Sequence, residues 1–228
     1  SISEINPSMT LLDIASFCKT KSNIKIEVNS HVETAWIKCL NKSSNSKMKV
    51  FCFPFAGADS NCFKELSKHF GYEYEMYVVQ LPARGDLIDE ALEVSAEVAV
   101  KKIVEQIFQI GLDMPFVFWG HEVGSSIAYA VATELERKHG LFPKALLLGA
   151  SAWSESQRVV QLSEQEFTEE LERKSYKDTY GSTSLVRADL SLMEGLMSLE
   201  RSIVFYPVYL LIGKNSDHSD LLRWLHLS

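Results

Sequence analysis

One carboxylate framed by two glycines is the feature of the sequence that most directly suggests chemistry. Residues 116–126 read FVFWGHEVGSS, so Glu122 lies between Gly120 and Gly124. An apolar run precedes this turn and a helical pattern follows it. A strand-to-helix turn this tight strains its central residue and excludes side chains on its flanks. It aims the central side chain into a pocket and presents the next backbone N–H, that of Val123, to an oxyanion.

Five short apolar runs, each ended by Gly, Pro or a similar break, supply the elements that would position this turn. Runs of this kind are typical of strands that are buried on both faces. The runs are Met48–Phe53, Glu75–Gln80, Phe116–Trp119, Ala145–Gly149 and Val208–Ile212. Helical patterns over Ala91–Ile110 and Ser125–Lys138 fill two of the gaps, and Gly140 is a candidate C-cap. The alternation predicts an α/β fold with a mostly parallel sheet.

A longer segment, about residues 154–201, interrupts this alternation and predicts a helical lid. Ser163 and Glu166 form a capping-box pattern ahead of one amphipathic helix, and a second helical pattern covers Leu185–Leu199. Residues 1–46 are interpreted as an N-terminal extension or linker, in which Asn6–Lys19 predicts one short helix. We therefore expect the main domain to occupy residues 47–228.

Composition restricts the partners. The chain has a formal net charge of −7, with 46% hydrophobic and 23% charged residues. This balance argues against nucleic acid as a partner, and no stretch is apolar enough to predict a membrane span. The cysteines have neither C-x-x-C nor zinc-ligand spacing, so we expect no metal, and we expect reduced thiols in a cytoplasmic protein.

Several motifs together resemble the type II thioesterases of polyketide and nonribosomal peptide synthesis. The glycine-framed turn resembles their nucleophile elbow, G-x-S-x-G. The other matching segments are Ala35-Trp36-Ile37, Phe51–Ala58 (FCFPFAGA), Gln80–Gly85 (QLPARG), Leu162-Ser163 with Glu166-Phe167, and Arg187-Ala188-Asp189. The resemblance implies an α/β-hydrolase fold with a helical lid. It implies no cofactor of the domain's own, because the acyl thioester is carried on the phosphopantetheine of an acyl or peptidyl carrier protein. Residues 6–17 are also similar to the last helix of an acyl carrier protein, which would place the domain behind a carrier.

The chain departs from the family pattern at its catalytic residues. The resemblance implies a nucleophilic Ser at position 122, assisted by an Asp and a His from later in the chain. Glu122 occupies the elbow, Asp217 is the candidate acid after the fifth strand, and His226 is the candidate His, with His218 as the other one available. A carboxylate that attacked a thioester would form a reactive anhydride, so a Ser-like role for Glu122 is not expected.

Three functions stay open for this elbow. Glu122 could be a general base that removes an α-proton, leading to dehydration, isomerisation, epimerisation or cyclisation, or it could activate water. The N–H of Val123 and one near Ala56 and Gly57 would polarise the thioester carbonyl. Alternatively the domain is inactive and only binds the acyl chain or the carrier. Hydrolysis through Ser125 or Ser126 is disfavoured, because neither lies at the apex of the turn.

The remaining candidate substrate-binding residues surround this elbow. Trp153 follows the fourth strand, whose carboxyl end faces the site in α/β sheets. Phe55 is a candidate pocket wall. His121 is a candidate contact, although packing against a neighbouring loop is the alternative. Arg84 could bind a phosphate or an acid, or form a structural ion pair.

Overall fold

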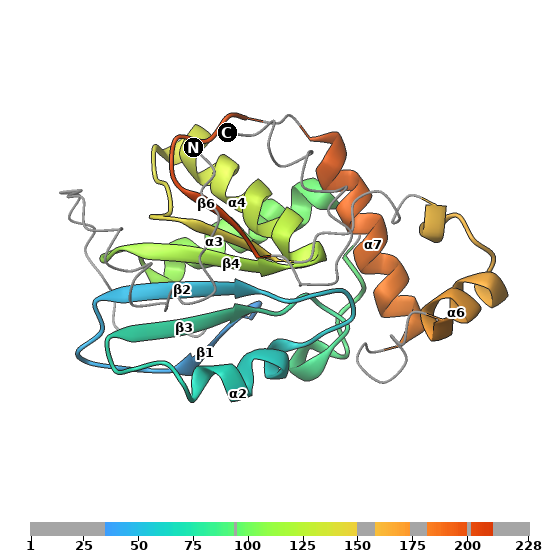
Figure 1. Cartoon of the computed structure of the whole chain (residues 1–228), viewed down its shortest axis with the longest axis horizontal. Helices are drawn as coiled ribbons and strands as arrows, with labels where there is room; N and C mark the ends of the chain where they lie inside the picture. The colour runs from blue at the N-terminus through green and yellow to red at the C-terminus, as the bar shows by residue number, and fades with distance from the viewer. Residues whose placement is uncertain (1–34, 94, 150–157, 174–181, 200–201, 212–228) are drawn as a thin grey trace.

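A six-stranded sheet in the order β1-β3-β2-β4-β5-β6 forms the centre of the molecule (Figure 1). The computed structural model describes residues 35–93, 95–149, 158–173, 182–199 and 202–211. The strands are β1 (Ile37–Asn41), β2 (Met48–Phe53), β3 (Tyr74–Val79), β4 (Phe116–His121), β5 (Leu146–Gly149) and β6 (Val208–Leu211). The pairs from β3 through to β6 are parallel, and only the β1–β3 pair is antiparallel. The expectation of an α/β fold with a mostly parallel sheet is confirmed.

Helices cover both faces of this sheet, so its central strands are buried on both sides. Every residue of β2 and β3 is buried. Along β2, Phe51 and Phe53 join the core beneath α3 (Ala96–Ile110), α4 (Val123–His139) and α7 (Thr183–Ser198), whereas Val50 and Cys52 face the opposite core. The latter core is closed by η1 (Ser60–Phe63) and α2 (Lys64–Ser67).

The helix ends follow local capping residues. Helix α3 begins at Ala96 and not at Ala91, because the Ser95 side chain accepts a hydrogen bond from the Val98 N–H and so caps the helix there. Helix α4 begins directly after the turn, at Val123, two residues before the predicted start. Its predicted C-cap is confirmed: Gly140 adopts the left-handed conformation with φ 64°.

The segment between β5 and β6 contains α6 (Glu164–Arg173) and α7, as the helical patterns predict. The capping box is present, since the Glu166 N–H donates to Ser163 Oγ and the Ser163 N–H donates to Glu166 Oε2. Helix α7 packs against α3 and α4, and α6 lies at the far end of α7, away from the sheet (Figure 1).

The N-terminal boundary of the sheet differs from the sequence prediction. Residues 37–41, assigned to the extension, form β1, which pairs with β3 at the edge of the sheet. The predicted helix Asn6–Lys19 lies outside the described residues. Among the described residues, no helix combines the length and the apolar character that crossing a membrane requires.

Candidate active site

The predicted elbow is present at the carboxyl end of β4. Glu122 is the single residue between β4 and α4, and its φ of 53° and ψ of −118° are strained for a side chain of this kind. Main-chain hydrogen bonds hold the bend on both sides. The Glu122 N–H donates to the Gly149 carbonyl at 2.7 Å, and the Ser125 N–H donates to the Glu122 carbonyl at 2.9 Å.

The two flanking glycines are required by close packing of the main chain. A Cβ atom on Gly120 would lie 2.3 Å from the Gly124 carbonyl oxygen, and one on Gly124 would lie 2.0 Å from the Phe53 carbonyl oxygen. Both distances are far inside van der Waals contact. The start of α4 therefore rests directly on the end of β2, and the steric argument made from the sequence holds.

The Glu122 carboxylate lies against one of the predicted backbone donors. Its side chain reaches across to β2's end, where Oε2 accepts the Ala56 N–H at 3.3 Å, and Glu122 is only 7% exposed. The second predicted donor, the Val123 N–H, belongs to the first residue of α4, so the helix itself provides no acceptor for it. The structure thus brings the Glu122 carboxylate to the Ala56 N–H, and Val123 is the next residue along the chain.

Residues 55–58, which we call the donor turn, carry the Ala56 N–H. The Ala58 N–H donates to the Phe55 carbonyl at 3.1 Å, and Gly57 has a φ of 75°, which is the geometry of a type II turn. The Gly57 N–H donates to Asp189 Oδ2 at 2.7 Å. Of the two N–H groups considered near this position, that of Ala56 faces Glu122 and that of Gly57 faces Asp189.

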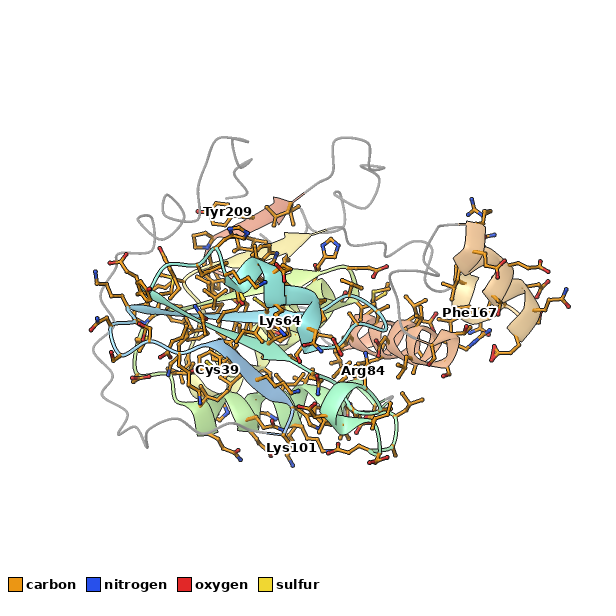
Figure 2. All side chains as sticks on the ribbon, turned by 90° about the horizontal axis from the view of Figure 1, so that it is seen from below. Cys39, Lys64, Arg84, Lys101, Phe167 and Tyr209 are labelled. Carbon is orange, nitrogen blue, oxygen red and sulfur yellow. The ribbon has the colours of Figure 1, made fainter. Side chains whose placement is uncertain are left out.

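Arg84 forms the ion pair that was one of its two sequence interpretations. Its guanidinium contacts Asp189 of α7 through two hydrogen bonds, Nη1 to Oδ2 at 2.6 Å and Nη2 to Oδ1 at 2.7 Å. Figure 2 shows Arg84 beside α7. Contact of Arg84 with substrate stays a prediction. The role of Asp189 was missed: its motif was recognised, but nothing in the sequence indicated that it contacts the donor turn.

His121 and Phe55 pack against each other beside the elbow. Their ring centroids lie 6.0 Å apart in an edge-to-face arrangement with an interplanar angle of 83°. Burial lowers the pKa of His121 below its ordinary value of about 6.5, so the imidazole is neutral at pH 7. The contact agrees with the packing alternative for His121.

The two serines after the elbow do not have the environment of nucleophiles. Ser125 and Ser126 are both buried, and Ser125 Oγ donates to the Gly149 carbonyl at 3.0 Å. This agrees with the low expectation for hydrolysis through either hydroxyl. The predicted residues Trp153, Asp217, His218 and His226 lie outside the described residues.

A cavity of about 440 Å³ opens beside the donor turn. Its walls come from the donor turn, from η1 and the residues before it, from the loop around Arg84, and from the first turn of α7. The lining residues include Phe55, Gly57, Asp59, Cys62, Ile88 and Leu185. Phe55, Gly57 and Ala58 of the donor turn border this cavity, whereas Ala56 and Glu122 are not among its lining residues.

Comparison with known proteins gives a consistent result. A family model described as "Thioesterase domain" matches residues 48–204. Gramicidin S biosynthesis protein GrsT of Aneurinibacillus migulanus is 30% identical over 113 residues, which cover 50% of this chain and 44% of GrsT. The human S-acyl fatty acid synthase thioesterase, medium chain, is 24% identical over 209 residues, 82% of this chain and 77% of that protein. The match to GrsT thus spans less than half of that relative's length.

The fold also matches solved structures. BorB, a type II thioesterase from the borrelidin biosynthetic cluster, superimposes with a TM-score of 0.68 at 20% identity, covering 81% of this chain and 78% of BorB. YbtT, a type II thioesterase from the yersiniabactin pathway, gives a TM-score of 0.67 at 19% identity, covering 85% of each chain. The resemblance drawn from the sequence motifs is confirmed at the level of the family. Because the family model covers more than half of the 228 residues, this chain belongs to the thioesterase domain family.

Proposed function

We propose that the domain acts on an acyl thioester presented on the phosphopantetheine arm of a carrier protein, with Glu122 as a general base. The observation that carries this proposal is the position of the Glu122 carboxylate, at the apex of a strained bend and 3.3 Å from the Ala56 N–H. In this family fold, that N–H and the Val123 N–H flank the point where a thioester carbonyl would be polarised.

The reaction begins with an exchange of hydrogen-bond acceptors. The thioester oxygen takes the N–H groups of Ala56 and Val123, and the displaced carboxylate turns toward the substrate. In one route Glu122 takes the α-proton, and the electrons of that C–H bond move to the carbonyl oxygen, giving an enolate held by the two donors. In the other, Glu122 takes a proton from water, hydroxide adds to the carbonyl carbon, and the departing thiolate recovers the proton.

The local structure supports a base more than a nucleophile. The distance of 3.3 Å between the Ala56 nitrogen and Glu122 Oε2 is at the long end for an N–H···O hydrogen bond. Replacing Glu122 by a substrate oxygen as the acceptor therefore costs little hydrogen-bond free energy. Glu122 is almost completely buried, and a buried carboxyl group is commonly used or fully satisfied.

A second candidate function is binding without chemistry. One observation favours it: both central N–H groups of the donor turn already have protein acceptors, Glu122 for Ala56 and Asp189 for Gly57. A carboxylate that never leaves the Ala56 N–H would block the polarising position. The domain would then hold an acyl chain or a carrier protein and leave the thioester unchanged.

Glu122→Gln separates these functions, because Gln keeps the size and the acceptor oxygen but cannot take a proton. The purified protein would be incubated with a panel of acyl-pantetheines and acyl-carrier proteins in D₂O, and mass spectrometry would follow deuterium uptake, loss of water and thiol release. We expect turnover in the wild type and none in Glu122→Gln. Glu97→Gln, an exposed position on α3, is the matched control and should behave as wild type. Equal turnover in Glu122→Gln and wild type would eliminate the base, whereas saturable binding with no mass change in any substrate would establish the binding function.

A further inference from the structure

A buried ion pair lies next to the donor turn and has no part in the chemistry described above. Arg84 and Asp189 are joined by two short hydrogen bonds, and their side chains are 5% and 2% exposed. Arg84 follows β3, whereas Asp189 comes from the middle of α7, in the insertion between β5 and β6. The pair therefore joins two segments that are 105 residues apart.

Stability alone does not account for such a pair. Both ions lose their hydration on burial, and well-packed apolar residues of similar size often serve equally well. The contacts that the pair makes with its surroundings are more informative, because charge-assisted hydrogen bonds fix geometry.

Both members of the pair bind the donor turn. Asp189 Oδ2 accepts the Gly57 N–H at 2.7 Å as well as Arg84 Nη1. Arg84 Nη1 also lies 3.4 Å from the Ala58 carbonyl oxygen, and its Nε donates to the Pro82 carbonyl at 3.2 Å. The turn is thus held at two successive residues, immediately after the residue whose N–H faces Glu122.

The contact with Gly57 selects the turn type. Gly57 is the third residue of the turn and its φ is 75°, as type II requires. In a type I turn the central peptide, between Ala56 and Gly57, faces the opposite way, and the Gly57 N–H would leave the carboxylate. Asp189 fixes the peptide between Ala56 and Gly57. The Ala56 N–H belongs to the preceding peptide, which is joined to this one at the Ala56 Cα atom. Asp189 therefore also restricts the direction of the Ala56 N–H.

From this arrangement, and resting on the proposed function, we infer that Asp189 is a positioning residue that aims the Ala56 N–H at the thioester oxygen, with Arg84 fixing the Asp189 carboxylate. The direction of the Ala56 N–H then depends on α7, which carries Asp189, as well as on β2, which precedes the donor turn. A displacement of α7 away from the donor turn would release the Gly57 N–H and change the direction of the Ala56 N–H.

The direct test observes the two amides in the ligand-free protein, so it does not depend on any reaction. In ¹⁵N-labelled wild type, the amide protons of Ala56 and Gly57 should both resonate downfield, as expected for hydrogen bonds to carboxylates. The main variant is Arg84→Met with Asp189→Leu, which removes both charges together. We expect the Gly57 and the Ala56 signals both to move in this variant.

Two further variants show whether the effect is specific. Asp189→Asn keeps an oxygen for the Gly57 N–H, so it should return the Ala56 signal toward its wild-type position. Glu164→Gln removes the Arg187–Glu164 ion pair, which anchors the same helix to α6 and not to the donor turn, and should leave both signals unchanged. If the double variant does not fold, Arg84→Lys replaces it, because Lys keeps the charge but cannot make the bidentate contact with Asp189. The same two amide signals, those of Ala56 and Gly57, are then compared with wild type.

The inference is overturned if the Gly57 signal moves in the double variant and the Ala56 signal does not, because the ion pair would then hold only its own contact. Once a turnover substrate is found, the double variant should lower kcat by about 100-fold with a much smaller change in KM, the size expected for a misplacement of about 1 Å. A rise in KM with kcat unchanged would contradict a positioning role even if Glu122 is the base.

Discussion

Glu122 and Ala56, which are 66 residues apart in the sequence, meet through a hydrogen bond from the Ala56 N–H to Glu122 Oε2. The carboxylate therefore occupies the donor to which the proposed function assigns the thioester oxygen. In the proposed reaction, Glu122 and the substrate compete for this N–H, so that reaction begins with the movement of the Glu122 side chain. The backbone around it is already arranged.

The strain at residue 122 predicts an unusual order of stability among its variants. Glu122→Gly and Glu122→Ala both lose the contact with Ala56, but only Gly relaxes at a φ of 53°. The Ala variant keeps backbone strain of about 1–3 kcal/mol that the Gly variant loses. The greater flexibility of Gly in the unfolded chain offsets about 0.4–1 kcal/mol of this gain. The Gly variant should therefore be about 1 kcal/mol more stable than the Ala variant. Urea unfolding measures this difference.

The control for this comparison lies within α4. At Glu134 the backbone is helical, so Gly should be about 1 kcal/mol less stable than Ala, which is the opposite order. The same order at both positions would show that residue 122 is not strained.

The flanking glycines give a second prediction, because a Cβ atom would collide with main chain at both. Gly124→Ala would place a methyl group 2.0 Å from the Phe53 carbonyl oxygen, and Gly120→Ala would place one 2.3 Å from the Gly124 carbonyl oxygen. We expect each to lower the free energy of unfolding by roughly 3 kcal/mol or more, the upper range for overpacking. Gly71→Ala, where no atom lies within 4 Å, should change it by less than about 0.5 kcal/mol. A Gly124→Ala variant as stable as Gly71→Ala would refute the close approach of α4 to β2.

The Arg84–Asp189 pair should be strongly coupled in a double-mutant cycle. Arg84→Met or Asp189→Leu alone leaves one buried charge without a partner, which should cost about 3–5 kcal/mol. The double variant should recover most of this loss, except for about 1–3 kcal/mol from the Gly57 N–H left without an acceptor. Denaturant unfolding of the four proteins gives the coupling energy. Additive losses would mean that the two side chains do not depend on each other.

Stability should depend on pH through His121. Burial lowers its pKa in the folded protein below the value of about 6.5 in the unfolded chain, so the unfolded state binds the proton more readily. The contribution of the neutral imidazole is complete above pH 6.5 and is lost as the pH falls below it, by at most about 1.4 kcal/mol per pH unit. Thermal unfolding at pH 7.5 and 5.5 should show a larger decrease in Tm for wild type than for His121→Gln. Parallel decreases would place His121 in contact with solvent.

Elements defined by local signals could be predicted from the sequence. The bounds of β2 match the predicted run Met48–Phe53, because the run is mostly apolar and Pro54 ends it. The elbow could also be located, since its two glycines and its position between strand and helix are visible within eleven residues. Strand β1 was missed because it lies at the edge of the sheet. Only Ile37 is fully buried in it, and its sequence contains no continuous apolar run.

The arrangement of the site depends on contacts that no local pattern encodes. Asp189 lies in an α-helical pattern whose period predicts burial but not a partner, and its contacts are 105 and 132 residues away. The hydrogen bond between Glu122 and Ala56 likewise requires β2 and β4 to be neighbours, with Phe53 opposite Gly120. The sequence could indicate which residues approach the elbow, but not which of two adjacent N–H groups each carboxylate would bind.

The bend at residue 122 is maintained by its own main chain, through the Gly149 carbonyl, the Ser125 N–H and two glycines. None of these contacts uses the side chain at the apex. The main-chain contacts that shape the bend are therefore independent of the side chain at position 122, although that side chain also accepts the Ala56 N–H. A substitution at this position changes the group displayed at the bend and its contact with Ala56, and it leaves the hydrogen bonds that form the bend in place.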